Sequence, residues 1–267
     1  MTDALGVDDG VGVGVGVPFD SEIPHTRLLK FGLEIEPARA FWRGAPARAE
    51  DAFDALTFGD KSLDRVRALL RILRERFERP PQALPVLRAW TGLDAPTRAL
   101  VCHWHTQLSD PLYRAFTGEL LPQRRDVGHQ TLRRDEALAF VTERTGDRLR
   151  ISTRVQLVSK LCSAAREAGL LSGITDPRQL QCVRPTDDAL TYLLYLLRGV
   201  GVADGAIGDT PYLRSLGLTP DALDRQLRGL RGVGVRRQGA LLELDWAHAD
   251  LLAWARDGLG LSVEETP

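Results

Sequence analysis

The sequence contains little lysine and little cysteine. Only three lysines occur among its 35 basic residues, so arginine carries nearly all of the positive charge. Such a composition is common in GC-rich genomes and by itself indicates no particular function. Cys102, Cys162 and Cys182 are too few and too scattered for a disulfide framework. They predict reduced thiols in a cytoplasmic protein.

Long hydrophobic runs are also absent. The longest, Ala189 to Leu197, contains Thr191 and is far shorter than the roughly 20 residues that a membrane-spanning helix needs. The N-terminus is acidic, whereas a secretory signal starts with positive charge. We therefore expect a soluble, cytoplasmic protein with no membrane partner.

Motifs that bring catalytic groups together are missing. There is no GxSxG, HExxH or GxxxxGK[ST] sequence. The adjacent carboxylates of Asp187 and Asp188 would point apart, and Asp188 is suited to cap a helix. These absences predict a protein that is not an enzyme and that has no cofactor, although an active site without a recognisable motif stays possible.

The stretch from Cys102 to His105 is the first place to look for a metal site. Residues two apart in a helix point to different sides, so His103 and His105 are poorly placed to share one ion. Neither CxxC nor HxxxH stands nearby. We expect no metal, and instead a helix that buries Cys102 and one face of Trp104.

The net charge of -1 hides a basic middle region. Residues 26–90 carry 13 basic and 9 acidic side chains, and residues 120–185 carry 12 and 7. Residues 1–25 contain five acids and no lysine or arginine, while the region from 186 onward has 8 basic against 12 acidic residues. Local basic surfaces matter more for nucleic-acid binding than the total charge does.

Residues 1–24 form a low-complexity segment in which Gly and Val alternate from Gly10 to Val17. This pattern offers little packing surface and predicts a disordered tail, with a short exposed strand as the alternative. It is no dinucleotide-binding fingerprint, because neither a strand before it nor a helix after it is predicted.

Residues 25–120 predict an N-terminal helical bundle. Helical spacing of apolar residues is clearest from Ser62 to Phe77. Three further helices are expected: one from Pro37 to Trp42, one from Asp94 or Thr97 to Leu108, and one from Pro111 that Gly118 and Pro122 break.

Residues 121–185 predict a winged helix-turn-helix. A helix from Arg134 to Glu143 is followed by a turn at Gly146 and by a second helix to about Ala168, capped by Ser152 or Thr153. Gly169 is suited to end that helix. A turn and a short strand from Leu180 to Arg184 complete the order helix, turn, helix, wing.

Residues 186–258 predict a helix–hairpin–helix segment. Its expected parts are helices at Asp188–Leu197 and Thr219–Leu230, a hairpin over Val233–Asp245 and a helix over Trp246–Asp257. The segment is either a second winged unit or packing support. Residues 259–267 are expected to fray. The predicted fold class is therefore mainly α, with a helical bundle, a winged helix-turn-helix with a small β wing, and a helical and hairpin extension.

Basic and amide side chains around residues 124–160 are the candidate DNA contacts. Arginine can bond phosphates or guanine edges, and glutamine can reach adenine in the major groove. The first residues of a recognition helix face the bases. The expected phosphate contacts are Arg124, Arg125, Arg133, Arg134 and Arg150, and those in or near the major groove are Thr153, Arg154, Gln156 and Lys160. The alternative is a solvated face with ion pairs to neighbouring acids.

The sequence resembles the BrxA family, small accessory proteins of BREX bacteriophage-exclusion systems. The resemblance covers most of residues 26–200 and none of its motifs is specific alone. Its residues are Thr26–Leu33 with Glu36 and Arg39, the arginine-rich Leu63–Phe77, Trp104–Phe116 with its Leu-Ser-Asp-Pro-Leu sequence, and Ser152–Leu171.

The resemblance implies a helical protein that binds double-stranded DNA without cutting it, beside a methyltransferase, an ATPase and a phosphatase-like protein of the BREX system. It supplies no catalytic residues, and the DNA contacts above come from the helix pattern alone. Two alternatives stay open: a scaffold that binds another defence subunit, and a transcriptional regulator of its own operon.

Overall fold

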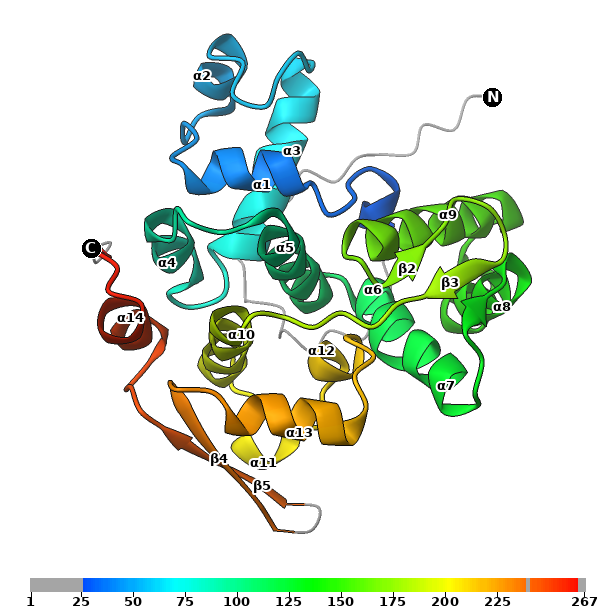
Figure 1. The fold of residues 1–267 in the computed structure, drawn as a ribbon. Coiled ribbons are helices and arrows are strands. Elements are labelled where there is room, and N and C mark those ends of the chain that lie inside the picture. The colour runs from blue at the N-terminus through cyan, green and yellow to red at the C-terminus, as the bar shows by residue number, and fades with distance from the viewer. Residues whose placement is uncertain (1–25, 239–240, 264–267) are drawn as a thin grey trace, which may run out of the picture.

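A computed structural model describes residues 26–238 and 241–263 (Figure 1). The predicted disordered tail at 1–24 and the last four residues lie outside this range. The chain is mainly helical with two small antiparallel sheets, which confirms the predicted fold class. None of the described helices is both long and apolar enough to cross a membrane.

The N-terminal part is a bundle whose helices begin at the residues that the sequence favours. Ser62 accepts a hydrogen bond from the backbone N–H of Arg65 at the start of α3, and Asp94 caps α5 by accepting one from Thr97. Pro80 and Pro81 follow the end of α3. The bounds are η1 Arg27–Leu29, α1 Ile35–Trp42, α2 Ala49–Asp54, α3 Leu63–Phe77, α4 Ala83–Ala89 and α5 Ala95–Ser109.

Helix α5 lies at the centre of the molecule. Every side chain from Leu100 to Leu108 is buried, including polar ones. The helix contacts α1 and α3 together with three later helices, α6 (Pro111–Ala115), α9 (Ile151–Glu167) and α10 (Asp187–Gly199). Buried apolar side chains from Leu28 to Val263 form one contiguous core around it.

The predicted break at Gly118 and Pro122 is wrong. Helix α6 continues through a π-helical turn, η2 (Phe116–Leu120), into α7 (Leu121–Asp126). In this turn the N–H of Leu121 bonds the carbonyl of Phe116, five residues back, so the helix passes a proline without ending. A Cβ on Gly118 would lie 2.3 Å from the Cβ of Pro211 in α12 (Pro211–Arg214). The glycine therefore permits close helix packing.

The next elements follow the winged-helix order. They are β1 Thr131–Leu132, α8 Arg134–Thr145, η3 Gly146–Arg148, α9, β2 Leu171–Ser172 and β3 Arg178–Leu180. The strands form an antiparallel sheet of order β1-β3-β2, with Leu132 opposite Arg178 and Leu171 opposite Leu180. The sequence predicts a strand over residues 180–184, whereas β3 ends at Leu180. The residues that pair with β1 and β2 are Arg178–Leu180. We call α7 to β3 the first winged unit.

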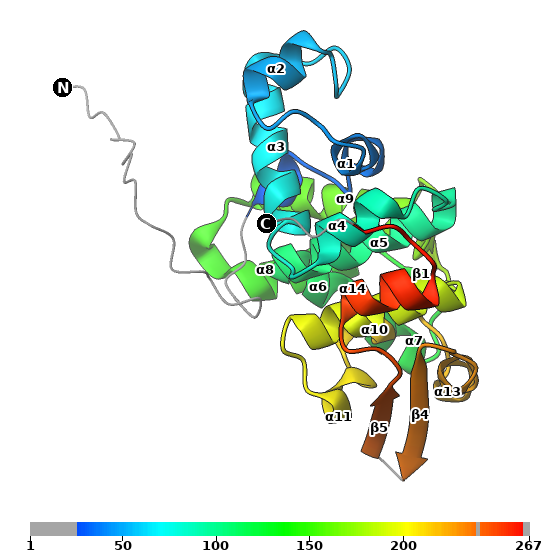
Figure 2. The same ribbon diagram turned by 90° about the vertical axis from the view of Figure 1, so that its left-hand side faces the viewer.

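The C-terminal part contains α10, α11 Asp204–Ile207, α12, α13 Pro220–Arg228, the hairpin of β4 Val233–Gln238 and β5 Leu241–Trp246, α14 Leu251–Ala253 and the π-helical η4 Trp254–Gly258. Figure 2 shows the hairpin projecting from the body beside α13. Thr186, whose hydroxyl accepts from Ala189 N–H, caps α10, so the predicted cap at Asp188 is wrong.

The last predicted helix starts later than expected. It begins at Leu251 because β5 extends to Trp246 and Asp250 provides the cap. Residues 259–263 are held in place, contrary to the expected fraying: Leu261 N–H bonds the carbonyl of Ala255, and Val263 is buried.

Gly118→Ala should destabilise the fold, because its Cβ would overlap Pro211. We expect a loss of about 1–3 kcal/mol in the free energy of unfolding, measured by urea denaturation. Gly199→Ala is the matched control, since Gly199 ends α10 with nothing within 4 Å of an added Cβ. Equal stability of both variants would contradict the close packing of η2 against α12.

Candidate nucleic-acid interface

The outer face of α9 is polar and open. Its exposed side chains are Ser152, Gln156, Ser159 and Lys160, with the half-buried Ser163 beside them. The opposite side buries Leu157, Val158 and Leu161 against the core. Short serine side chains would let another molecule approach the helix backbone closely, while Gln156 and Lys160 would reach beyond them. We call these five polar residues the outer face of α9.

Helix α9 begins earlier than expected. Its N-cap is Arg150, so the predicted cap at Ser152 or Thr153 is wrong. Neither of those residues provides a side-chain cap, and Thr153 lies half-buried inside the first turn. Arg150 itself is exposed at the start of the helix.

Arg154 does not belong to the outer face, contrary to the expectation that it lies on the polar side. Its side chain is only 12% exposed. The guanidinium donates to the carbonyl of Gly146 and lies 3.7 Å from Asp147. A signal existed in the sequence, because Arg154 precedes Val158 by four residues and Leu161 by seven, which is the spacing of the buried stripe. Arg154 ties α9 to the turn after α8.

Arg124 and Arg125 are engaged with other parts of the chain. Arg124 lies 2.7 Å from a carboxylate oxygen of Glu136 on α8. Arg125 donates through Nη2 to the carbonyl of Gln181, 2.8 Å away, and its guanidinium lies against Gly217. Desolvation lowers the pKa of Arg125. Arg125 thus joins α7 to the segment after β3, at Gln181, and to the turn before α13, at Gly217.

The remaining candidates are exposed around α9. Arg133 lies 4.0 Å from Asp135, which partly balances its charge. The side chains of Arg134, Arg150 and Lys160 form no hydrogen bond or ion pair with residues that the structure describes. Arg166, also exposed and without such a partner, continues the spacing of 152, 156, 159 and 163 along α9. That spacing could have identified Arg166 from the sequence.

Two exposed isoleucines flank α9. Ile151 in its first turn is 61% exposed, and Ile174 at the tip of the wing is 78% exposed. The wing is held to α8, since Asp176 accepts a hydrogen bond of 2.7 Å from the backbone N–H of Arg134. Apolar side chains at such positions can contact thymine methyl groups or the apolar surface of a protein. Neither isoleucine stands out in the sequence.

The buried pair His103 and His105 forms two separate hydrogen-bonded chains. The Ser215 hydroxyl donates to the carbonyl of Tyr212 (2.8 Å), so it accepts from His103 Nε2–H (3.0 Å), and His103 Nδ1 accepts from the Tyr113 hydroxyl (2.9 Å). His105 Nδ1–H donates to the carbonyl of Arg76 (2.6 Å), and its Nε2 accepts from the Tyr192 hydroxyl (2.7 Å). Both rings are therefore neutral.

Burial lowers the pKa of His103 to about 3 and that of His105 to about 4. The prediction that the two rings point to different sides is confirmed, as is the burial of Cys102. Trp104 is buried entirely and not on one face alone. Among the described residues, no three histidine, cysteine or carboxylate side chains are grouped to hold a metal ion.

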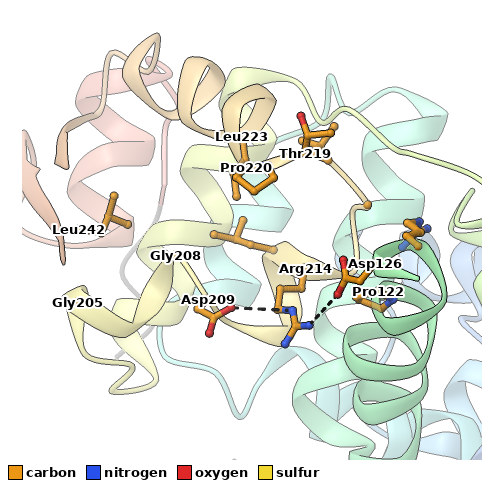
Figure 3. Close-up of a pocket in the computed structure, with 14 residues that line it drawn as sticks. Pro122, Asp126, Gly205, Gly208, Asp209, Arg214, Thr219, Pro220, Leu223 and Leu242 are labelled. Carbon is orange, nitrogen blue, oxygen red and sulfur yellow. Dashed lines mark ion pairs between the residues drawn. The ribbon is translucent and has the colours of Figure 1, made fainter. Parts of the chain in front are cut away.

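A cavity of about 560 Å³ lies where α7 meets the C-terminal part of the chain. Figure 3 shows Arg214 between Asp126 of α7, at 3.8 Å, and Asp209, at 3.9 Å. Leu223 and Leu242 belong to its apolar wall. Because the charges in this cavity balance one another, it favours neither an anionic nor a cationic ligand.

Comparisons with known proteins support the fold alone. No family model matches the chain, and no curated protein does. The chain is similar to the crystal structure of an uncharacterized protein from Magnetospirillum magneticum, with a TM-score of 0.53 and 15% sequence identity. The likeness covers 68% of this chain and 100% of that one.

Acid should destabilise the protein through the two buried histidines. Their pKa values in the folded state lie below the ordinary value of 6.5, so between pH 6.5 and about 4 the unfolded chain binds protons that the folded chain does not. The free energy of unfolding should fall by roughly 1.4 kcal/mol per pH unit for each histidine in this window. Above pH 6.5 their contribution should be constant.

Urea denaturation at pH 7, 6 and 5 measures this slope. Nitrogen-15 NMR of the histidine rings at pH 5.5 identifies its source, with a proton expected on Nε2 of His103 and on Nδ1 of His105. Doubly protonated rings in the folded protein at that pH would contradict the assignment.

Proposed function

We propose that the chain is a non-catalytic, cytoplasmic protein that binds double-stranded DNA through the first winged unit, as an accessory component of a bacterial BREX phage-defence system. The observation that carries the DNA-binding proposal is the outer face of α9, which is open and polar and is adjoined by Arg150 and Arg166, exposed cations that form no ion pair with the residues that the structure describes. The BREX context rests on the resemblance to the BrxA family.

The electrostatics around α9 support a polyanionic partner. Residues 131–184 contain ten basic and six acidic side chains. The described structure engages part of this charge internally, at Arg154 for example, but Arg134, Arg150, Lys160 and Arg166 stay available. Phosphate contacts give affinity and orientation, and they are most effective from such unpaired cations.

The shape of the first winged unit supports the same partner. A recognition helix fits the major groove of B-DNA, and a wing beside it can contact the backbone or the minor groove. In α9 the polar residues Gln156 and Lys160 would face the groove, and Arg150 would meet a phosphate near the start of the helix. Ile174 on the wing would lie beside the duplex.

A scaffold for another defence subunit is the second candidate. The exposed Ile151 and Ile174 favour it, because apolar side chains at 61% and 78% exposure are also suited to a protein interface. Such a protein would bind DNA weakly and with little dependence on salt, and it would co-purify with its partner.

Arg150→Ala/Lys160→Ala should weaken binding to a labelled 30-base-pair duplex. Removal of two phosphate contacts is expected to reduce affinity roughly tenfold or more and to flatten the salt dependence by about 0.9 per contact. Fluorescence anisotropy over a salt series measures both quantities.

Arg43→Ala/Arg88→Ala is the control for this experiment. It removes the same charge from exposed positions at the end of α1 and on α4, and neither arginine forms an ion pair with a residue that the structure describes. If both double variants lose affinity equally, general charge and not α9 is responsible. If the wild type fails to bind at low salt, DNA is the wrong partner.

A further inference from the structure

The C-terminal part of the chain repeats the order of elements found in the first winged unit. Helix α10 is followed by the short α12, a turn, α13 and the antiparallel hairpin of β4 and β5. In the first unit, α7 is followed by α8, a turn, α9 and the hairpin of β2 and β3. The second set includes one extra turn, α11, and has no described counterpart of β1. We call α10 to β5 the second winged unit.

The junction between α12 and α13 has the features of a helix-turn-helix. Gly217 has a φ of 70° in the turn, a conformation in which glycine is favoured. Thr219 then caps α13 by accepting a hydrogen bond of 3.3 Å from Ala222 N–H, and Pro220 takes the first helical position. The first unit also has a positive-φ glycine, Gly146, between its two helices.

Specific hydrogen bonds hold the second recognition-type helix and its hairpin. Gln226 of α13 donates to the carbonyl of Pro185 (2.6 Å), and Leu223 and Leu227 are buried beside it. The Tyr195 hydroxyl of α10 donates to Gly232 (2.8 Å) and accepts from His248 N–H (3.0 Å), one bond on either side of the hairpin. The hairpin is thereby fixed to the helices, as a wing is.

Arginines are concentrated in α13 and β4, within an otherwise acidic region of the sequence. From Arg225 to Leu242 the sequence contains five arginines and no acidic residue. These five are most of the eight basic residues found from 186 onward. Arg225, Arg228 and Arg236 are exposed, and for Arg225 and Arg236 the described structure shows no ion pair or hydrogen bond. Nearby acids are Asp221 in the first turn of α13 and Asp224, which lies 3.8 Å from Arg228. On β5, the exposed Glu243 stands opposite Arg236 in the hairpin, and the exposed Asp245 follows it.

The two winged units are joined firmly. Val183 N–H, just after β3, donates to the carbonyl of Leu216 in the second helix-turn-helix (2.8 Å). Arg125 of α7 fills the space beside Gly217, where a Cβ would lie 2.6 Å from the guanidinium carbon. In Figure 1, α9 and α13 lie apart, with α12 and the α6–α7 helix between them. The two recognition-type helices are therefore held in a fixed relation.

We propose that the second winged unit is a second site for double-stranded DNA, which contacts the phosphate backbone through Arg225, Arg228 and Arg236. A helix with a wing suits a duplex groove, and the five arginines between residues 225 and 237 supply positive charge that complements the phosphates. The inference extends the proposed function, since it assumes that DNA is the partner of the first unit. DNA contact through both units gives a steeper salt dependence than either unit alone.

Arg225→Ala/Arg228→Ala tests this site, with the 30-base-pair duplex and the salt series used for Arg150→Ala/Lys160→Ala. The second-unit variant should lose affinity roughly tenfold and flatten the salt slope by up to about 1.8. Combination of both pairs of substitutions should flatten it further. Arg43→Ala/Arg88→Ala should bind like the wild type.

Hydrogen exchange on the wild type gives a second, independent measurement. Saturating duplex should slow exchange in residues 220–238 as well as in 150–166, and should not do so around Arg88. This readout stands even where the Arg225→Ala/Arg228→Ala variant fails to fold, which a thermal unfolding curve would show.

Each outcome separates the two proposals. In one outcome, Arg150→Ala/Lys160→Ala loses binding, Arg225→Ala/Arg228→Ala keeps the wild-type affinity and salt slope, and the duplex does not slow exchange in residues 220–238. This outcome would overturn the second site and leave the proposed function intact. Loss only in the second-unit variant would support the second site and remove α9 from the interface. If the wild-type protein does not bind the duplex at low salt, both proposals fail.

Discussion

Burial of helix α5 is the constraint on which the remainder of the structure depends. A helix with so many buried polar side chains needs hydrogen-bond partners inside the protein, because unpaired polar groups in the core cost free energy. Most of these groups have one, and Trp104 Nε1 and Gln107 Oε1 have none among the described residues. His103 therefore requires Tyr113 and Ser215, and His105 requires Arg76 and Tyr192. These partners come from α3, α6, α10 and the second helix-turn-helix, so α5 fixes the relative positions of segments far apart in the chain.

This arrangement gives the surface helices α9 and α13 a rigid support. Helix α9 packs on α5 directly, and α10, the first helix of the second winged unit, also packs on it. The hydrogen bond from Val183 to Leu216 and the close contact of Arg125 with Gly217 then join the two winged units. A surface that must match the geometry of a partner benefits from such support, because little conformational entropy is lost on binding.

The arginines of this protein have two physical roles that composition does not separate. Arg76, Arg125 and Arg154 are turned inward, where each donates to a backbone carbonyl. Burial lowers the pKa of Arg76 and Arg125, which shows the cost of removing a guanidinium from water. Arg150 and Arg225 stay exposed and have no described partner. Only exposed arginines of this second kind contribute an accessible positive surface.

The sequence by itself determined the local features. The helices predicted to start at Ser62, at Asp94 or Thr97, and at Thr219 begin after the caps Ser62, Asp94 and Thr219. The winged order of residues 131–180 followed from helical spacing and glycine positions. Caps and amphipathic faces depend on residues three to seven apart, and single-sequence patterns contain that information. The outer face of α9 was recognisable for the same reason.

Tertiary structure decided the features that depend on distant partners. Gly118 permits contact with Pro211 where the sequence predicts a helix break, and Arg125 meets Gly217 and Gln181 where it predicts a phosphate contact. The buried direction of Arg154 could be derived from spacing, but its bond to Gly146 could not. In each case the determining group lies elsewhere in the chain, and only the folded core brings it into contact.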